Sequence, residues 1–144
     1  MIDTRLAPYG LFGLRVALGL MFVAHALLKY LVFTMPGFEG FLAKLGLPAV
    51  LAWPIFFAEL LGGIAIVAGF YGRYVSAALL PVLLGAVFVH AGNGWLFTAV
   101  GGGWEYPAFL AVAAVTHVLA GDGAFALRPA ALPVLSPVPS PQAA

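Results

Sequence analysis

Four ionisable side chains lie inside the apolar stretches of this chain, where an acid and a base could exchange a proton or bind a polar ligand. The acid is Glu59, near the middle of the apolar run 49–69. The bases are Arg15, His25 and Lys29, which at 3.6 residues per turn fall within an arc of about 80° on one helix face. A charge at the centre of a bilayer costs roughly 2.5–3.5 kcal/mol unless it is compensated. The pattern therefore predicts a shared polar core, with Glu59, His25 and Lys29 as candidate catalytic residues.

Glu59 needs a cationic partner. If two antiparallel helices are matched by depth, Glu59 lies between Arg15 and His25, about 7–8 Å from each along the membrane normal. Arg15 is the stronger electrostatic partner, because a guanidinium stays charged and can hold a carboxylate with two hydrogen bonds. His25 would instead give a proton-exchanging pair. Two alternatives stay open: a purely structural ion pair, and basic side chains that extend separately to the two membrane surfaces.

Further polar and aromatic residues cluster around the gap between the last two apolar runs, and with His25 and Lys29 they could rim a pocket on the outer face. The predicted lining of a substrate or quinone pocket is Arg15, His90, Trp95, Glu105 and Tyr106. His25 and His90 could also ligate a haem axially, although two interfacial histidines explain them more simply. His117 is predicted to be a core histidine that bonds to a neighbouring helix. No set of residues predicts a metal site.

Four apolar runs must position these groups, at about 8–33, 49–69, 74–91 and 104–120. Hydrophobic residues make up 64% of the chain and charged residues 8%, against about 25% charged residues in a soluble domain. The mean hydropathy of +1.11 agrees with this. Only helices and closed barrels satisfy their backbone in lipid, and these runs lack the alternation of barrel strands. The sequence predicts an all-α integral membrane protein, a four-helix bundle over residues 1–128.

The remaining segments refine this prediction. Residues 34–48 carry apolar side chains at helical spacing, which indicates a short amphipathic or re-entrant segment between the first two spanning helices. Residues 129–144 are rich in proline and predict a disordered tail. Basic residues near the helix ends favour a multi-pass protein of the cell (inner) membrane with both termini in the cytoplasm. Trp53, Trp95 and Trp104 would then mark the outer interface.

Composition also excludes several classes of function. The net charge of +1 leaves no basic face for nucleic acid. The absence of cysteine excludes disulfides and Cys-ligated clusters within the chain. No flavin motif is present, so electrons in any redox role must come from a partner or pass directly from substrate to quinone.

In order along the chain, several motifs resemble the DoxX family of small four-helix membrane proteins, over roughly residues 15–128. They are Arg15-x2-Leu18-Gly19-x2-Phe22-x2-His25-x3-Lys29, Glu59-x2-Gly62-Gly63, His90-x2-Asn93-Gly94-Trp95, Trp104-Glu105-Tyr106-Pro107 and Gly121-Asp122-Gly123. One departure is Ala26, where the family usually has glycine. The resemblance implies a four-helix membrane fold and an association with quinone-linked oxidation, whereas other members resemble partner-binding or assembly subunits.

Three functions follow from these observations. The first is a membrane subunit of a quinone-linked oxidoreductase system, with a quinone as the expected cofactor or substrate. The second is a non-catalytic accessory subunit, which binds a protein partner or another copy of itself in the membrane. The third is a small proton-coupled transporter, although the inner half of the chain offers few polar residues besides Arg15 and His117. Membrane lipid is an expected partner of all three.

Overall fold

The computed structural model describes residues 3–129, and this part of the chain is all-α. Its α-helices are α1 (Ala7–Leu31), α2 (Met35–Lys44), α3 (Ala52–Ala68), α4 (Gly72–His90) and α5 (Glu105–Ala120). Two short 3-10 helices, Ala49–Leu51 and Ala91–Asn93, precede α3 and follow α4. The predicted tail, 129–144, lies outside the described residues except for Pro129.

Three of the helical segments are long and apolar enough to cross a membrane: Ala7–Leu31, Ala49–Ala68 and Gly72–Asn93. The fourth apolar helix, α5, has 16 residues and a length of about 24 Å at 1.5 Å per residue. It is therefore shorter than the roughly 30 Å of a hydrocarbon core. Length and apolar composition together make the chain a membrane protein.

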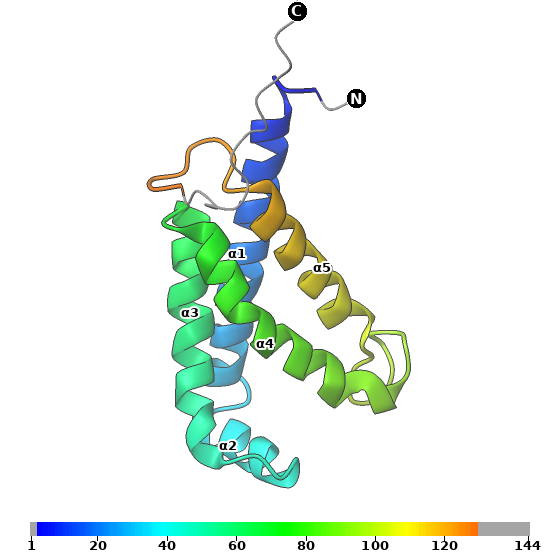
Figure 1. The fold of residues 1–144 in the computed structure, drawn as a ribbon. Coiled ribbons are helices and arrows are strands. Elements are labelled where there is room, and N and C mark those ends of the chain that lie inside the picture. Colours follow the sequence, from blue (N-terminus) through cyan, green and yellow to red (C-terminus); the bar gives the residue numbers. More distant parts are fainter. Residues whose placement is uncertain (1–2, 130–144) are drawn as a thin grey trace, which may run out of the picture.

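The apolar helices pack as two pairs, α1 with α3 and α4 with α5 (Figure 1). Glycines set the closest approach between α1 and α3. A Cβ atom added to Gly19 would lie 2.7 Å from the carbonyl oxygen of Gly63, and one added to Gly63 would lie 2.7 Å from that of Gly19. Only glycine tolerates so short a distance between the two backbones. Small residues commonly allow membrane helices to approach each other in this way. The Gly19–Gly63 contact thus fixes the register of α1 against α3.

We call the two ends of the molecule basal and distal. The basal end contains the start of α1, the turn between α3 and α4, and the end of α5; the distal end contains α2 and the loop 91–104 (Figure 1). At the basal end, segment 121–128 runs from α5 across to the other helices. Ala124 N donates to Pro8 O at 2.8 Å, and Arg128 N donates to Gly69 O at 3.0 Å. The segment therefore ties α5 to α1 and to the α3–α4 turn.

The predicted amphipathic segment is α2, which lies across the distal end of α1 and α3 (Figure 1). The Thr34 side chain caps its first turn by accepting a hydrogen bond from Gly37 N at 3.3 Å. Its apolar side chains form a small core with α1 and α3, made of Ala26, Met35, Phe38, Leu42, Ala52 and Phe56. A larger core fills the centre of the molecule, around Leu18, Phe22, Ile66, Leu79, Leu83, Leu110 and Ala114.

Candidate functional site

Glu59 is paired with Lys29 near the distal end. Lys29 Nζ lies 2.6 Å from Glu59 Oε2, and the two side chains are 15% and 6% exposed. The same ammonium lies 5.6 Å from the centroid of the Phe38 ring, on α2. An acid and a base are thus held in contact between α1 and α3, with the Phe38 ring of α2 beside them.

The predicted partners of Glu59, Arg15 and His25, were wrong. Gly19 of α1 stands opposite Gly63 of α3, and the two helices are antiparallel. Glu59, four residues before Gly63, therefore stands opposite Val23, four residues after Gly19. Side chains on a helix tilt towards its N-terminus. Because α1 and α3 are antiparallel, the Lys29 and Glu59 side chains tilt towards each other, whereas Arg15 lies two turns further towards the basal end.

His25 stacks on Tyr106 of α5. The ring centroids are 5.4 Å apart and the planes differ by 16°. The Tyr106 hydroxyl is buried and has no hydrogen-bond partner among residues 3–129. A buried hydroxyl without a partner costs about 1–3 kcal/mol, which a ligand with an acceptor oxygen would recover. The prediction that His25 faces the interior of the molecule, on the same side as Arg15 and Lys29, is confirmed.

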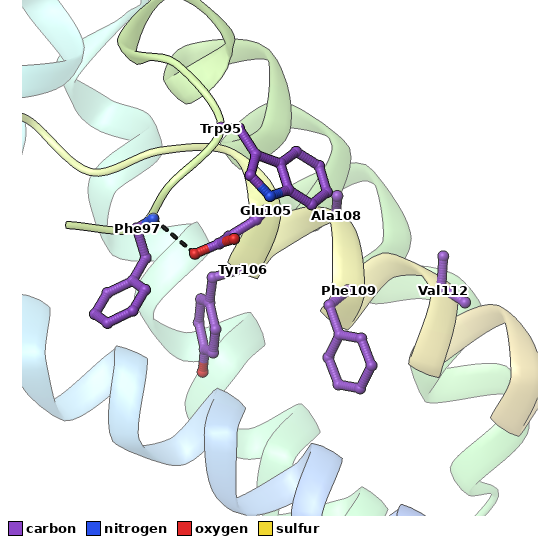
Figure 2. Close-up of a pocket in the computed structure, with 7 residues that line it drawn as sticks. All are labelled: Trp95, Phe97, Glu105, Tyr106, Ala108, Phe109 and Val112. Atoms are coloured by element: carbon purple, nitrogen blue, oxygen red, sulfur yellow. Dashed lines mark hydrogen bonds between the residues drawn. The ribbon is translucent and has the colours of Figure 1, made fainter. Parts of the chain in front are cut away.

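A groove of about 520 Å³ runs over the distal end of α5 (Figure 2). It is lined by Trp95, Phe97, Glu105, Tyr106, Ala108, Phe109 and Val112. A smaller cavity of about 210 Å³, which we call the slot, lies between α1 and α5. It is lined by Leu14, Ala17, Leu18, Met21, Tyr106, Phe109, Leu110 and Ala113. Figure 2 shows the Tyr106 side chain directed from the groove towards α1, with its hydroxyl at the far end.

Glu105 shapes the groove rather than standing free in it. Its Oε1 accepts a hydrogen bond from Phe97 N at 2.8 Å, and its own N–H donates to Trp95 O at 3.1 Å (Figure 2). Trp95 in turn packs edge-on against Trp104, with 4.5 Å between ring centroids. The carboxylate therefore holds residues 95–97 against the start of α5, and the predicted lining residues Trp95, Glu105 and Tyr106 are brought together.

The other two predicted lining residues are placed elsewhere, which corrects that part of the expected pocket. His90 Nδ1 lies 2.7 Å from Ala86 O, so its ring is turned onto its own helix. Arg15 is fully buried at the basal end, where Nη2 donates to Ala124 O at 3.0 Å. Neither residue lines the groove or the slot.

Arg15 belongs to a second polar cluster at the basal end, which the sequence did not predict. His117 Nδ1 is 2.8 Å from Ser76 Oγ, and His117 Nε2 is 3.2 Å from Asp122 Oδ1. All three side chains are buried, and Asp122 also interacts electrostatically with Arg15. The cluster joins α1, α4, α5 and segment 121–128. The prediction that His117 is a core histidine bonded to a neighbouring helix is confirmed by Ser76, on α4.

Comparison with known proteins shows the family of this chain. A family model described as DoxX matches residues 10–92, more than half of the chain. The chain belongs to the DoxX family. A Haemophilus influenzae protein described only as "Uncharacterized protein" is 31% identical over 124 residues, which cover 83% of this chain and 89% of that protein. A Bacillus subtilis protein named "Putative oxidoreductase CatD" is 35% identical over 77 residues, covering 51% of this chain and 54% of that protein. The chain thus spans about half the length of the Bacillus relative, and no solved structure matches it.

In this DoxX protein the two polar clusters are separated along the helices. The distal pair and the His25–Tyr106 stack lie on one side of the central apolar core, and the Arg15–His117–Asp122 cluster lies on the other. Leu18, Phe22 and Leu110 belong to the layer between them. The distal end, where a residue that lines the groove carries an unsatisfied hydroxyl, is therefore the candidate ligand site. The fully buried basal cluster is suited to holding helices together.

Proposed function

We propose that this protein is a four-helix membrane subunit of a quinone-linked oxidoreductase, and that it binds the quinone ring in the groove at the distal end. The observation that carries this proposal is the buried, unpartnered hydroxyl of Tyr106, a residue that lines the groove and whose side chain reaches from it towards α1 (Figure 2). A quinone presents a flat apolar ring with carbonyl acceptors, which suits an apolar cavity with a few placed donors. The oxidoreductase name of the Bacillus relative supports the same class of reaction.

The residues around the groove have distinct roles in this proposal. In this arrangement the quinone ring lies along the Tyr106 side chain, and one carbonyl reaches its inner end (Figure 2), where the hydroxyl donates a hydrogen bond. His25 holds the phenol ring in place by stacking on it. Reduction of a quinone to a quinol takes up two electrons and two protons. The electrons come from a donor carried by a protein partner. The Lys29–Glu59 pair, one helical turn along α1 from His25, is the buried acid–base pair that would exchange these protons.

The site also fits the expected topology. With both termini in the cytoplasm of a cell (inner) membrane protein, the distal end lies at the outer surface. Trp53, Trp95 and Trp104 then lie at that surface, where indole rings are favoured. The ring of the quinone would sit at interfacial depth and its chain would extend into the bilayer.

A non-catalytic accessory subunit is the second candidate, and the exposed apolar side chains around the groove favour it. Phe97 is 67% exposed, Val100 98% and Phe109 70%. In that case a helix of another membrane protein, or of a second copy, covers this face, and the groove accepts its side chains. The two functions differ in whether a free quinone binds.

The test is a binding titration of 2,3-dimethoxy-5-methyl-1,4-benzoquinone, which has no isoprenoid chain, to the detergent-solubilised protein. Tyr106→Phe removes only the hydroxyl and should weaken binding by about 3- to 10-fold, the equivalent of one hydrogen bond. Tyr30→Phe is the matched control, because Tyr30 is half exposed on α1 and lines neither cavity. Equal affinity in Tyr106→Phe and wild type would contradict the proposal, and complete absence of quinone binding would favour the accessory subunit.

A further inference from the structure

The groove and the slot share a wall. Tyr106 and Phe109 line both cavities, so these two side chains of α5 stand at the boundary between the groove and the slot. The slot then follows α5 from Tyr106 to Ala113, about 10 Å towards the centre of the helix bundle at 1.5 Å per residue. Its opposite wall is α1, from Leu14 to Met21. Apart from the Tyr106 hydroxyl, every side chain that lines the slot is apolar.

We infer that the slot is a subsite for the isoprenoid chain of the quinone. This rests on the proposed function, because it assumes that the groove holds the ring. A ligand that spans both cavities must have a flat, hydrogen-bonding part near Tyr106 and a continuous apolar part beyond it. A quinone with an isoprenoid chain has this order of groups, and the apolar part would extend from the interfacial end towards the middle of the bilayer.

The sizes of the two cavities agree with this division. At about 30 Å³ per water-sized group, the groove of about 520 Å³ holds roughly 17 non-hydrogen atoms. A dimethoxy-methyl-benzoquinone has about 13 such atoms with its substituents, so the groove has room for it. The slot of about 210 Å³ holds roughly seven on the same scale, which is between one and two five-carbon isoprene units. The rest of a longer chain would lie in lipid.

The slot should therefore increase the affinity only through the first one or two isoprene units of the chain. Moving an apolar chain from lipid to an apolar slot brings no hydrophobic gain, because lipid tails are as apolar as the slot; the gain comes from packing. We expect affinity to rise about 3- to 10-fold from no isoprene units to two, and to change less than about twofold beyond two. A chain that lies wholly in lipid would give no rise in affinity with chain length.

The experiment compares quinones with zero, one, two and four isoprene units on the detergent-solubilised full chain. Each is titrated as a mole fraction of the micelle, so that partition of longer chains does not imitate binding. Ala17→Phe narrows the slot from its exposed rim on α1, where a larger side chain has space. It should abolish the rise in affinity with chain length and leave the chain-free quinone unchanged. Leu20→Phe is the matched control, since Leu20 is exposed on the same helix and lines neither cavity.

Ala108→Phe separates failure of this inference from failure of the proposed function. Ala108 lines the groove but not the slot, so filling it should weaken all four quinones equally. If the chain-free quinone binds and responds to Ala108→Phe, but affinity does not depend on chain length, the chain subsite is wrong and the proposed function stands. The subsite is also wrong if Ala17→Phe releases a bound phospholipid, seen by mass spectrometry, without changing the chain-length profile. If the chain-free quinone fails to bind at all, the proposed function itself is wrong.

Discussion

Removing one member of the Lys29–Glu59 pair should destabilise the protein more than removing both. The two charged atoms are 2.6 Å apart and both side chains are largely buried. Breaking a buried ion pair typically costs about 3–5 kcal/mol, whereas replacing both members with neutral groups is often close to neutral. Lys29→Met keeps an unbranched side chain only one atom shorter, and Glu59→Gln keeps the shape of the side chain. We expect each single substitution to lower the free energy of unfolding by about 2–4 kcal/mol, and the double substitution to lower it by less than about 1.5 kcal/mol.

The two single variants should differ in a way that the structure explains. Lys29→Met leaves a carboxyl group that is 6% exposed and can take up a proton to become neutral, so its cost should fall near the lower end of that range. Glu59→Gln leaves an ammonium under Phe38 without its counter-charge, and this group must lose a proton or move past the ring to reach water. Unfolding in mixed micelles, followed by helical circular dichroism, gives each free energy.

Arg15 provides the control for this experiment. It lies at the basal end and shares no partner with Glu59, so Arg15→Leu and Glu59→Gln should be additive within about 0.5 kcal/mol. Additive effects of Lys29→Met and Glu59→Gln would refute the pairing. A rescue of Arg15→Leu by Glu59→Gln would refute the register of α1 against α3 as well.

Three further outcomes follow from the remaining contacts. Asp122→Asn removes the acid that joins His117 and Arg15, and should lower the free energy of unfolding of the solubilised protein by about 2–4 kcal/mol in the same unfolding assay. A change below about 0.5 kcal/mol would mean that the basal cluster does not hold the helices together. Gly63→Leu should prevent the close approach of α1 and α3 and abolish recovery of folded protein, whereas Gly40→Leu, where a Cβ meets nothing within 4 Å, should not. Cysteines placed at Thr4 and Gly102 should react with an impermeant thiol reagent from opposite sides of the membrane; labelling of both from one side would contradict the proposed topology.

The helices themselves could be predicted from sequence because hydropathy and length are local properties. The runs at 8–33, 74–91 and 104–120 agree with α1, α4 and α5 to within two residues at each end. The run at 49–69 corresponds to the 3-10 turn and α3 together. The apolar spacing in 34–48 likewise predicted α2, since the apolar positions follow the helical period.

The pairing between helices could not be predicted in the same way. Matching depths treats both helices as straight and centred in the membrane, and it placed Glu59 with Arg15 or His25. The actual register depends on where two backbones touch, at Gly19 and Gly63, and on the direction in which long side chains tilt. Either effect moves a side-chain atom by several ångströms, which is enough to exchange one partner for another.

The basal cluster was missed for a different reason. Ser76 looks like an ordinary polar residue in a helix, and Asp122 lies after the last apolar run, where an acid is normally exposed. The burial of Asp122 follows from segment 121–128 folding back over the helix ends, a long-range event with no local pattern, and Ser76 is buried where α4 meets His117 of α5. The only sequence signal was Asp122 between two glycines, both of which adopt positive φ.

The central claim is that a quinone carbonyl accepts a hydrogen bond from Tyr106, and infrared spectroscopy of the bound quinone tests it most directly. A benzoquinone labelled with carbon-13 at each carbonyl in turn is bound to the wild-type protein and to Tyr106→Phe. We predict that one carbonyl band of the wild-type complex shifts to lower frequency and returns to its position in apolar solvent in Tyr106→Phe, while Tyr30→Phe keeps the shift. Identical carbonyl bands in the wild type and Tyr106→Phe would contradict the account.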